Sequence, residues 1–378
     1  MPASGNVQEV DLAARLVRMC TTVDGREDEP LALLAGMLEK AGFVCETDSY
    51  DPTEPKRQSL VARLCPGDDR PSLYFGGHID TVPFGAGKWK KDPLCGEVVD
   101  GMLHGRGATD MKGGVAATVC ACIAMAPKLK GRDLVLHVYG SEERGCQGSL
   151  HVSAQPKFFG HAAAGVIAEP TELVPLVGHK GALWLTLRTK GKSAHASMPD
   201  KGDNALLKLM HAVRNLPTYV PKGTHPLLGG NTAAITTLHA GINTNSIPEE
   251  AVLTVDMRTI PGQDHKAIVA EVREIVGPDV EIEVSYDAIP VWTDPDDPWC
   301  KAARERTNAL AGNSPEVRAA AFFTDAASVR RAFPDMPLLV LGPGLARMCH
   351  VTDEVCPVDQ IVMARKIYEA LIEDWYRC

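Results

Sequence analysis

The segment Ser72–Pro83, with the sequence SLYFGGHIDTVP, joins a short apolar run to a group of polar residues. Ser72–Phe75 carries large apolar and aromatic side chains after a Pro-Gly-Asp-Asp turn at 66–69, and this pattern predicts a strand. His78 and Asp80 follow it, at the point where the strand is expected to end. In open α/β sheets, ligands bind beyond the carboxyl ends of the strands. The segment therefore predicts both a buried strand and a functional site at its end.

Alternating strand and helix patterns surround this segment in the first half of the chain. Apolar residues at helical spacing predict amphipathic helices at Val7–Thr22 and Leu31–Ala41, and Gly42 is the expected stop of the second. The small, apolar stretch Gly113–Met125 predicts a buried helix. Further strands are expected at Leu60–Leu64, Val98–Leu103 (a hairpin around Asp100-Gly101), Asp133–Tyr139 and Ala164–Ala168. This alternation predicts an α/β layer architecture.

The middle of the chain has a different order of elements. Strands are predicted at Leu183–Thr189, Ala233–Leu238, Ala251–Arg258 and Val280–Tyr286, and helices at Asn204–Leu216 and Asp264–Val276. This β-α-β-β-α-β order is typical of a ferredoxin-like α+β domain. After the Pro-rich segment Pro290–Pro298, the α/β pattern resumes with a helix at Trp299–Ala311, strands at Arg318–Phe322 and Leu338–Leu341, and a helix at Val358–Tyr376. We therefore predict an α/β domain formed by 1–181 and 290–378, interrupted by an inserted domain at 182–289.

The composition excludes several classes of protein. The 378 residues are 45% hydrophobic and 23% charged, which excludes disordered, collagen-like and coiled-coil chains. A net charge of −9 without any Lys/Arg block argues against nucleic acid or an anionic membrane surface as a partner. No apolar run of about 18 residues predicts a membrane span, and the first residues lack a secretory pattern. The 11 cysteines, an odd number without a C-x-x-C pair, predict reduced thiols in a cytoplasmic protein.

Acidic residues also gather in three other segments, Gly105–Gly114, Gly140–Glu143 and Ala168–Glu172, and glycine accompanies them in the first two. Each segment lies where a strand or hairpin is expected to end. Since ligand sites in α/β sheets form at the carboxyl ends of the strands, we expect the polar residues of the four segments to converge on one site. The candidate residues are His78, Asp80, Asp110, Glu142, Glu143 and Glu169.

The chemistry of this set points to a metal ion. Four or five carboxylates in one cleft repel each other strongly unless a cation neutralises them. Neutral imidazole with carboxylate oxygen is a zinc-type or cobalt-type ligand set that needs no thiolate. His78 and Asp80 are two residues apart in an extended segment, so they point to the same side, and Asp80 can orient the His78 ring. The adjacent Glu142 and Glu143 diverge, so that one can bind metal while the other acts as a base.

Other motifs are weak or absent. Gly105-x-Gly107 suggests a dinucleotide loop, and hence a nicotinamide-dependent dehydrogenase, but Asp110 occupies the position of the third glycine and the segment follows a hairpin. Gly191-Lys192-Ser193 lacks the upstream glycine of a phosphate-binding loop, and neither G-x-S-x-G nor H-E-x-x-H occurs. A metal-binding module without activity is a further alternative, and the presence of Glu142 beside the candidate ligands argues against it.

The motifs together resemble those of the M20 metallopeptidase family, in the branch of acetylornithine deacetylases and succinyl-diaminopimelate desuccinylases. The resemblance covers nearly the whole chain, and the motifs occur in the order of the family. The matching segments are His78–Pro83, Gly105–Gly114, Glu142-Glu143, Glu169-Pro170, Ser193–Pro199 and the late His350. The sequence departs from the family at Cys349, where alanine is common. The resemblance implies a zinc-peptidase-like catalytic domain, with helices around a mostly parallel sheet, and an inserted lid and dimerisation domain.

The resemblance also implies a role for each matching position. His78 and Glu169 would bind one divalent metal ion, Glu143 and His350 would bind a second, and Asp110 would bridge the two. Asp80 would orient His78, and Glu142 would act as general base and acid. In the inserted domain, His195 would stabilise the oxyanion in the partner subunit's active site, while Asn245 and Arg258 would contact the substrate, with Arg258 as its carboxylate anchor.

These roles predict a homodimeric hydrolase with two divalent metal ions, zinc first, with cobalt or manganese as alternatives. The expected substrate is a small N-acyl amino acid, cleaved at its amide bond by a hydroxide that bridges the metal ions, with Glu142 as general base. Dipeptidases and carboxypeptidases of the same family share such a site and are the alternative function. The sequence leaves the acyl group and the amino acid open.

Overall fold

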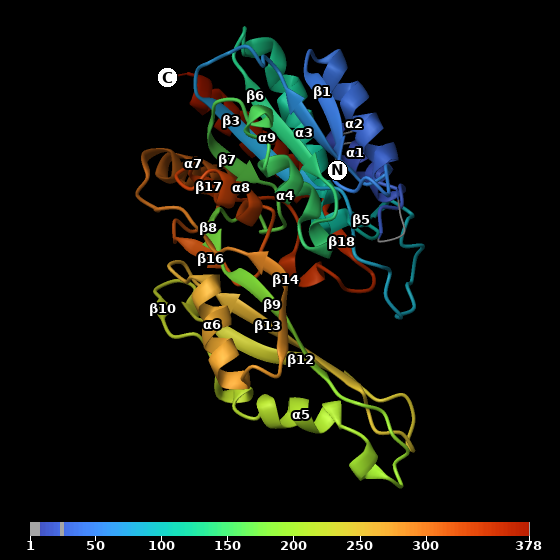
Figure 1. The fold of residues 1–378 in the computed structure, drawn as a ribbon. Helices are drawn as coiled ribbons and strands as arrows, with labels where there is room; N and C mark the ends of the chain where they lie inside the picture. Colours follow the sequence, from blue (N-terminus) through green and yellow to red (C-terminus); the bar gives the residue numbers. More distant parts are fainter. Residues whose placement is uncertain (1–7, 23–25, 378) are drawn as a thin grey trace. The chain divides into compact units, whose positions relative to one another are not determined.

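The computed structural model describes residues 8–22 and 26–377, which divide into two compact units (Figure 1). Unit 1 consists of Met1–Gly178, Trp292–Ala319 and Thr324–Cys378, and unit 2 of His179–Val291 and Ala320–Phe323. The span 182–289, predicted as the inserted domain, lies within His179–Val291. Residues 320–323, where the chain comes back to unit 2, were not expected there. Nothing in their local sequence distinguishes them from the rest of the strand predicted at Arg318–Phe322.

A nine-stranded mixed sheet is the framework of unit 1, and in three of its strands one terminal residue is assigned to unit 2. Its order is β1 (Val44–Ser49), β2 (Gln58–Arg63), β6 (Leu134–Tyr139), β3 (Ser72–His78), β7 (Ala162–Ile167), β17 (Leu338–Val340), β8 (Leu176–His179) and β15 (Val291–Trp292), with β16 (Arg318–Ala320) paired to β8. The four central strands β6, β3, β7 and β17 are parallel. The predicted parallel sheet flanked by helices is thus confirmed at its centre. The β1–β2 and β2–β6 pairs are antiparallel, and the eight residues between β1 and β2 are too few for a parallel crossover.

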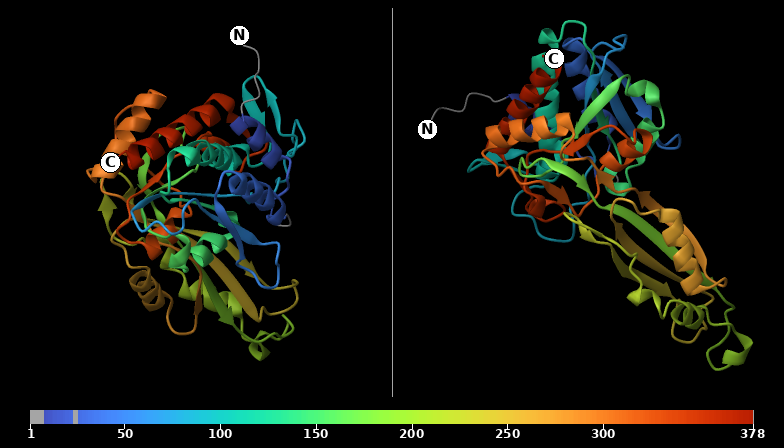
Figure 2. Two further views of the ribbon diagram at one scale, coloured as in Figure 1. Left: turned by 90° about the horizontal axis from the view of Figure 1, so that it is seen from above. Right: turned by 90° about the vertical axis from the view of Figure 1, so that its left-hand side faces the viewer.

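Helices cover both faces of this sheet (Figure 2). One face packs against α1 (Gln8–Val17), α2 (Asp28–Lys40), α3 (Gly113–Met125), α7 (Pro298–Ala311) and α9 (Val358–Tyr376), and α3 and α9 lie side by side on it. Leu73 and Phe75 belong to this core, whereas Tyr74 points to the other face and packs on Phe159. Phe159 in turn contacts Phe333 at the end of α8 (Ala326–Ala332), which packs with α4 (Gln147–Ser153).

The first predicted helix is longer than the observed one. Helix α1 ends at Val17 instead of Thr22, and the predicted first residue, Val7, lies outside the described residues. The segment after α1 is drawn away by the loop that follows β3: the Thr21 hydroxyl donates to the Ile79 carbonyl, and the Thr81 amide donates to the Thr21 carbonyl. A helical pattern in the sequence cannot report this tertiary contact.

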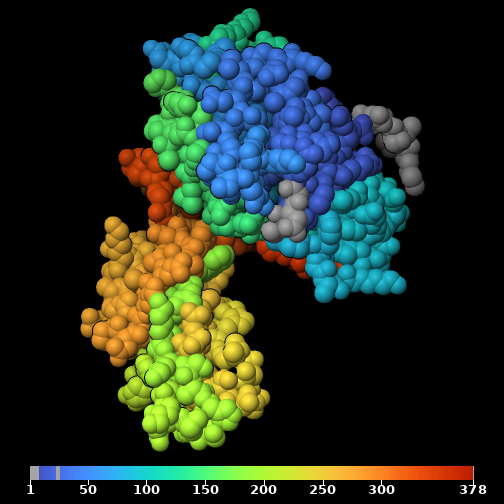
Figure 3. All heavy atoms as spheres, turned by 45° about the vertical axis from the view of Figure 1, so that its right-hand side comes forward, coloured from blue at the N-terminus to red at the C-terminus, as the bar shows by residue number. Residues whose placement is uncertain are grey.

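Unit 1 also contains a small sheet in the order β18 (Val355–Pro357), β5 (Met102–His104) and β4 (Glu97–Val99). The predicted hairpin around Asp100-Gly101 is confirmed, because β4 and β5 pair antiparallel and both turn residues have positive φ. Strand β4 is exposed along its length, and the residues around it, in cyan, lie at the surface of unit 1 (Figure 3). Strand β18 brings the segment after His350 next to the segment before Asp110.

Unit 2 has the predicted ferredoxin-like order. Its elements are β9 (Gly181–Lys190), α5 (Ala205–Ala212), β12 (Thr232–Ala240), β13 (Glu250–Thr259), α6 (His265–Val276) and β14 (Glu281–Ala288), with a small β10 (Thr224–His225) and β11 (Gly229–Gly230) pair between α5 and β12. The antiparallel sheet has the order β12-β13-β9-β14, and α5 and α6 pack on one face of it through Leu185, Leu253 and Val272. The Asp264 side chain caps α6 by accepting from the Lys266 amide.

Among the residues that the structure describes, no helix is both long enough and apolar enough to cross a membrane.

Candidate metal centre

Six of the predicted site residues meet His350 at one edge of the central sheet. His78 ends β3, Glu142 and Glu143 lie in the short 3₁₀ helix Glu142–Arg144 after β6, and Glu169 follows β7. His350 lies on the loop after β17. Because these four strands are parallel and adjacent, their carboxyl ends bring the loops together, as expected.

Asp110 reaches the same edge from the turn Ala108–Lys112, which immediately precedes α3. The start of α3 lies very close to the end of β7: a Cβ atom added at Gly114 would meet the Ala168 carbonyl oxygen at 2.1 Å. Only glycine allows this approach, which carries the Asp110 loop toward Glu169. The close approach at Gly114 therefore explains a glycine near the start of α3, where glycine is otherwise unfavourable.

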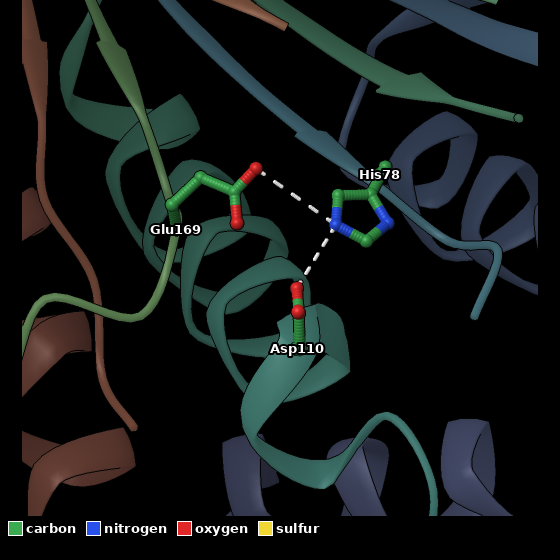
Figure 4. A group of neighbouring side chains, drawn as sticks. All are labelled: His78, Asp110 and Glu169. Atoms are coloured by element: carbon green, nitrogen blue, oxygen red, sulfur yellow. Dashed lines mark hydrogen bonds and ion pairs between the residues drawn. The ribbon is translucent and has the colours of Figure 1, made fainter. Parts of the chain in front are cut away.

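The two carboxylate oxygens of Asp110 face two different imidazoles. Its Oδ1 lies 3.2 Å from Nε2 of His78, and its Oδ2 lies 3.3 Å from Nε2 of His350. The Nε2 atom of His78 is also 3.8 Å from Oε1 of Glu169, and both carboxylates point at this nitrogen in Figure 4. On the other side, Nε2 of His350 is 3.0 Å from Oε2 of Glu143. Three groups of side chains here could hold a metal ion: two of them share Asp110, and the third combines His78 with Glu142 and Glu143.

Asp80 connects the loop after β3 to the loop after β6. Its carboxylate accepts the backbone amides of Glu142, at 3.0 Å, and Glu143, at 3.1 Å. Toward His78, its nearer atom is the carbonyl oxygen, 3.0 Å from Nδ1, while the carboxylate is at 3.5 Å. When the ring is neutral and Nδ1 donates to this carbonyl, the Nε2 lone pair faces Asp110 and Glu169 and is free to bind a metal ion.

Burial and mutual repulsion make this set of carboxylates hard to ionise. Burial raises the pKa of Glu142 and of Glu169 well above its usual range, and neighbouring carboxylates add to the effect. Burial and the Asp110 charge raise the pKa of Glu143 to about 7. Hydrogen bonds that the His350 ring donates to Asp110 and Glu143 raise the pKa of His350 to about 10. Burial opposes the ionisation of Asp110, but the hydrogen bonds with His350 and His78 prevail and lower its pKa.

A divalent cation at each group would relieve this repulsion and let the carboxylates ionise. The donor atoms fit such ions, since imidazole nitrogen with carboxylate oxygen is the ligand set of zinc and related metals. Each of the two groups that share Asp110 offers one imidazole nitrogen, which binds metal when it is unprotonated, and two carboxylates. The residues present are therefore suited to hold two metal ions.

Several residues that support the site were not singled out from the sequence. Ser141, at positive φ just before Glu142, contacts the Tyr50 hydroxyl at 2.6 Å, and this hydroxyl donates to Oε2 of Glu27 at 2.6 Å. Asp325, fully buried at the start of α8, interacts electrostatically with His78 and Asp80, and burial raises its pKa to about 6. Apart from the acidic residue itself, no local pattern marks either group, because each is defined by contacts between distant segments.

The remaining predicted residues lie in unit 2. His195 and Asn245 are on neighbouring loops, joined by a 2.9 Å hydrogen bond from the Ala196 amide to the Asn245 carbonyl, and both side chains are exposed. The His195 ring bonds Ser197 Oγ through Nδ1 at 2.8 Å. The structure therefore brings His195 and Asn245 together.

Arg258 is separate from that pair within unit 2. It lies eight residues along β13 from Glu250, whose neighbour Glu249 bonds the loop that leads to His195. At about 3.3 Å per residue this is about 26 Å. The Arg258 guanidinium binds Asp256 with both arms, at 2.8 and 2.9 Å, and lies 5.4 Å over the ring of Phe323.

Residues 74–374 match peptidase family M20/M25/M40, and the chain belongs to this family of metal-dependent hydrolases. It is 28% identical to a succinyl-diaminopimelate desuccinylase of Methylobacterium radiotolerans, over 100% of this chain and 99% of the relative. It is 31% identical to an acetylornithine deacetylase of Photorhabdus laumondii, over 93% and 91%. Its fold matches an M20 family metallo-carboxypeptidase of Sulfolobus solfataricus with a TM-score of 0.83 at 16% identity, over 98% and 100%. The expected family and fold are confirmed.

The role of Asp80 as the acceptor for two backbone amides predicts the effect of its removal. In Asp80→Ala, the amides of Glu142 and Glu143 lose their acceptor, which we expect to cost about 1–3 kcal/mol for a buried amide. The thermal midpoint should fall, and amide exchange in residues 140–148 should accelerate, as measured by mass spectrometry. Asp51→Ala removes an exposed carboxylate that bonds Thr53 and should leave this exchange unchanged. Equal exchange in both variants would contradict the role of Asp80.

Proposed function

We propose that this chain hydrolyses the amide bond of an N-acyl amino acid, as an acetylornithine deacetylase or succinyl-diaminopimelate desuccinylase does. The observation that carries the proposal is Asp110, whose two oxygens face His78 and His350 beside the buried carboxylate of Glu142. The two relatives with these names align with nearly the whole chain, which supports this substrate class.

The proposed metal ligands follow from the two groups of side chains around Asp110. His78 and Glu169 hold the first ion, Glu143 and His350 hold the second, and Asp110 serves both. We propose zinc for both positions, with cobalt or manganese as alternatives, because the donors are nitrogen and oxygen without a thiolate. When bound, such a pair of ions lowers the pKa of a water molecule and polarises a carbonyl group.

Glu142 is the proposed general base and acid. Its carboxylate is buried next to the shared site, and Oε1 has the Cys146 thiol 3.8 Å away. Burial raises the pKa of Glu142 well above its usual range, and a carboxyl group of raised pKa is better suited to accept a proton than an exposed one. Glu142 takes a proton from the attacking water and returns it to the leaving amine. The products are a carboxylic acid and a free amino acid, and water supplies the atoms that each gains.

The proposed substrate contacts in unit 2 require two subunits. Arg258 anchors the substrate carboxylate, which takes the place of the Asp256 carboxylate on the guanidinium. His195 stabilises the oxyanion, and Asn245 contacts the substrate beside it. A small N-acyl amino acid cannot touch both ends of a span of about 26 Å along one β13. We therefore propose a homodimer formed through residues 182–289, in which the partner supplies His195 and Asn245 to the site.

The alternative function is that of a dipeptidase or carboxypeptidase of the same family, which the fold similarity to the Sulfolobus metallo-carboxypeptidase supports. We also propose a cytoplasmic location. All ten cysteines among the described residues are free, as is usual in a reducing compartment.

Hydrolysis assays with metal analysis test the proposed function. We expect two divalent ions per chain by elemental analysis, loss of activity with a chelator, and its return with zinc or cobalt. N-acetylornithine and N-succinyl-diaminopimelate should be cleaved in preference to a panel of dipeptides and carboxypeptidase substrates. Preference for the peptides would favour the alternative function, and active protein without any transition metal would refute the metal site.

Substitution of the two adjacent glutamates separates their proposed roles. Glu142→Ala should lower the turnover number by about 10²–10⁴-fold, since it removes the group that moves the proton, while both metal ions stay bound. Glu143→Ala should instead lower the occupancy of one metal position. Elemental analysis and initial rates of the purified variants measure both effects. The same loss of metal in both variants, without a separate effect on turnover, would show that the roles are not divided in this way.

Mixed dimers test the proposed contribution of the partner's loop. His195→Ala and Glu142→Ala chains should each be inactive alone, but in a mixed dimer one of the two sites has both groups intact. Random pairing makes half of the dimers mixed, so activity should recover to about a quarter of wild type if the sites are independent. Assay of the whole co-expressed population measures this, and mixed dimers isolated through two different tags should have about half of the wild-type activity, since one of their two sites is intact. Inactive mixed dimers would place His195 in its own subunit's site or outside catalysis.

A further inference from the structure

Arg106 and Glu354 form an ion pair behind Asp110 that the proposed reaction does not use. Their side chains are 3% and 0% exposed, and Nη1 of Arg106 lies 2.7 Å from Oε2 of Glu354. They are 248 residues apart in the sequence. A buried ion pair is weak evidence of stabilisation by itself, because desolvation offsets the attraction. Its hydrogen bonds show what it holds in place.

Glu354 accepts the backbone amides of the turn that carries Asp110. Its Oε1 accepts from the amides of Thr109, at 2.9 Å, and Asp110, at 3.1 Å, and its Oε2 accepts from that of Gly107, at 3.0 Å. Asp110 has φ −119° and ψ 95°, so the turn leaves the helical conformation here, and the Thr109 and Asp110 amides need an acceptor from outside the turn. The carboxylate of Glu354 replaces the missing acceptors and fixes the backbone from which the Asp110 side chain projects.

Arg106 extends the same contact to the loops of both histidines. Its Nη1 donates to the Val351 carbonyl, at 3.2 Å, directly after His350. Its Nη2 donates to the Pro83 carbonyl, at 3.1 Å, on the segment that begins with His78 and Asp80. One guanidinium thus bonds the loop on each side of Asp110, and Glu354 bonds the turn between them.

We propose that Arg106 and Glu354 are positioning residues that hold Asp110 between the two histidines and so determine the affinity of both metal positions together. The inference rests on the proposed function in that it concerns the same pair of metal ions. Asp110 must present one oxygen to each side at once, and a turn free to rotate would lose one of these contacts. Groups that orient metal ligands from behind typically change metal affinity by about 10–100-fold when substituted.

Glu354→Gln is the most direct test. Glutamine keeps the shape of the side chain but replaces one carboxylate oxygen with an NH₂ group, which cannot accept a hydrogen bond. In one orientation the NH₂ group faces the Arg106 guanidinium and the Gly107 amide. In the other it faces the amides of Thr109 and Asp110. Arg106→Lys is the second variant, for use if the first does not fold. Lysine keeps the charge but cannot bond Glu354, Val351 and Pro83 with one planar group.

Asp133→Asn is the matched control for stability. Asp133 is also a buried carboxylate, 1% exposed in its side chain, that pairs with an arginine, Arg63, and accepts a backbone amide, that of Cys65, at 3.2 Å. It lies just before β6, at the opposite edge of the sheet from the metal centre. A general loss of stability should therefore be similar in the control, whereas a loss of metal affinity should not occur there.

The experiment titrates cobalt into chelator-treated full-length protein and follows its visible absorption, with equilibrium dialysis and elemental analysis to count bound ions. We expect Glu354→Gln and Arg106→Lys to bind both equivalents about 10–100-fold more weakly, with an altered spectrum. Asp133→Asn should match wild type within about twofold, since sites far apart act independently. Wild-type affinity and spectrum in both test variants, with a lower thermal midpoint, would overturn this inference alone. Wild-type protein that takes up no cobalt would overturn the proposed function and this inference with it.

Discussion

Repulsion among carboxylates is the constraint on which the organisation of unit 1 depends. Five of them, Asp80, Asp110, Glu142, Glu143 and Glu169, are directed to one edge of the sheet, where the imidazoles of His78 and His350 face them. Burial makes the repulsion stronger, and it raises the pKa values of Glu142 and Glu169. A fold that gathers such groups needs a rigid frame to hold them and a cation to neutralise them, and the parallel strands provide the first.

Around the site, buried carboxylates accept hydrogen bonds from backbone amides that have no partner within their own loops. Asp80 accepts two amides of the loop after β6, and Glu354 accepts three amides of the turn at Asp110. The oxygens of Asp80 and Glu354 already accept hydrogen bonds from the backbone, whereas the carboxylates of Asp110, Glu143 and Glu169 face the histidines. The distinction separates groups that form the frame from groups that are free for chemistry, although the residue types are the same.

Unit 2 adds a different constraint, which concerns reach. Its sheet places Arg258 at one end of β13 and the loops of His195 and Asn245 beyond the other. A ferredoxin-like domain with both helices on one face keeps this spacing rigid, because Leu185, Leu253 and Val272 are packed beneath it. The proposed dimer is a consequence of that length, since one small substrate cannot span it. Arg258 also has Asp256 as a partner, so substrate binding would exchange one carboxylate for another.

The sequence by itself determined the features that depend on local patterns. The apolar run before His78, the polar residues at the ends of β3, β6 and β7, and the β-α-β-β-α-β order could all be predicted, because alternation and helical spacing record which faces are buried. Only the tertiary structure decided that the outer strands β1 and β2 pair antiparallel, that Thr21 leaves the helix to bond Ile79, and that Asp110 turns one oxygen to each histidine. The hydrogen-bond partners of Glu354 and of Tyr50 were likewise decided only by the tertiary structure. They depend on how buried polar groups from distant segments satisfy each other, and no pattern along one segment carries that information.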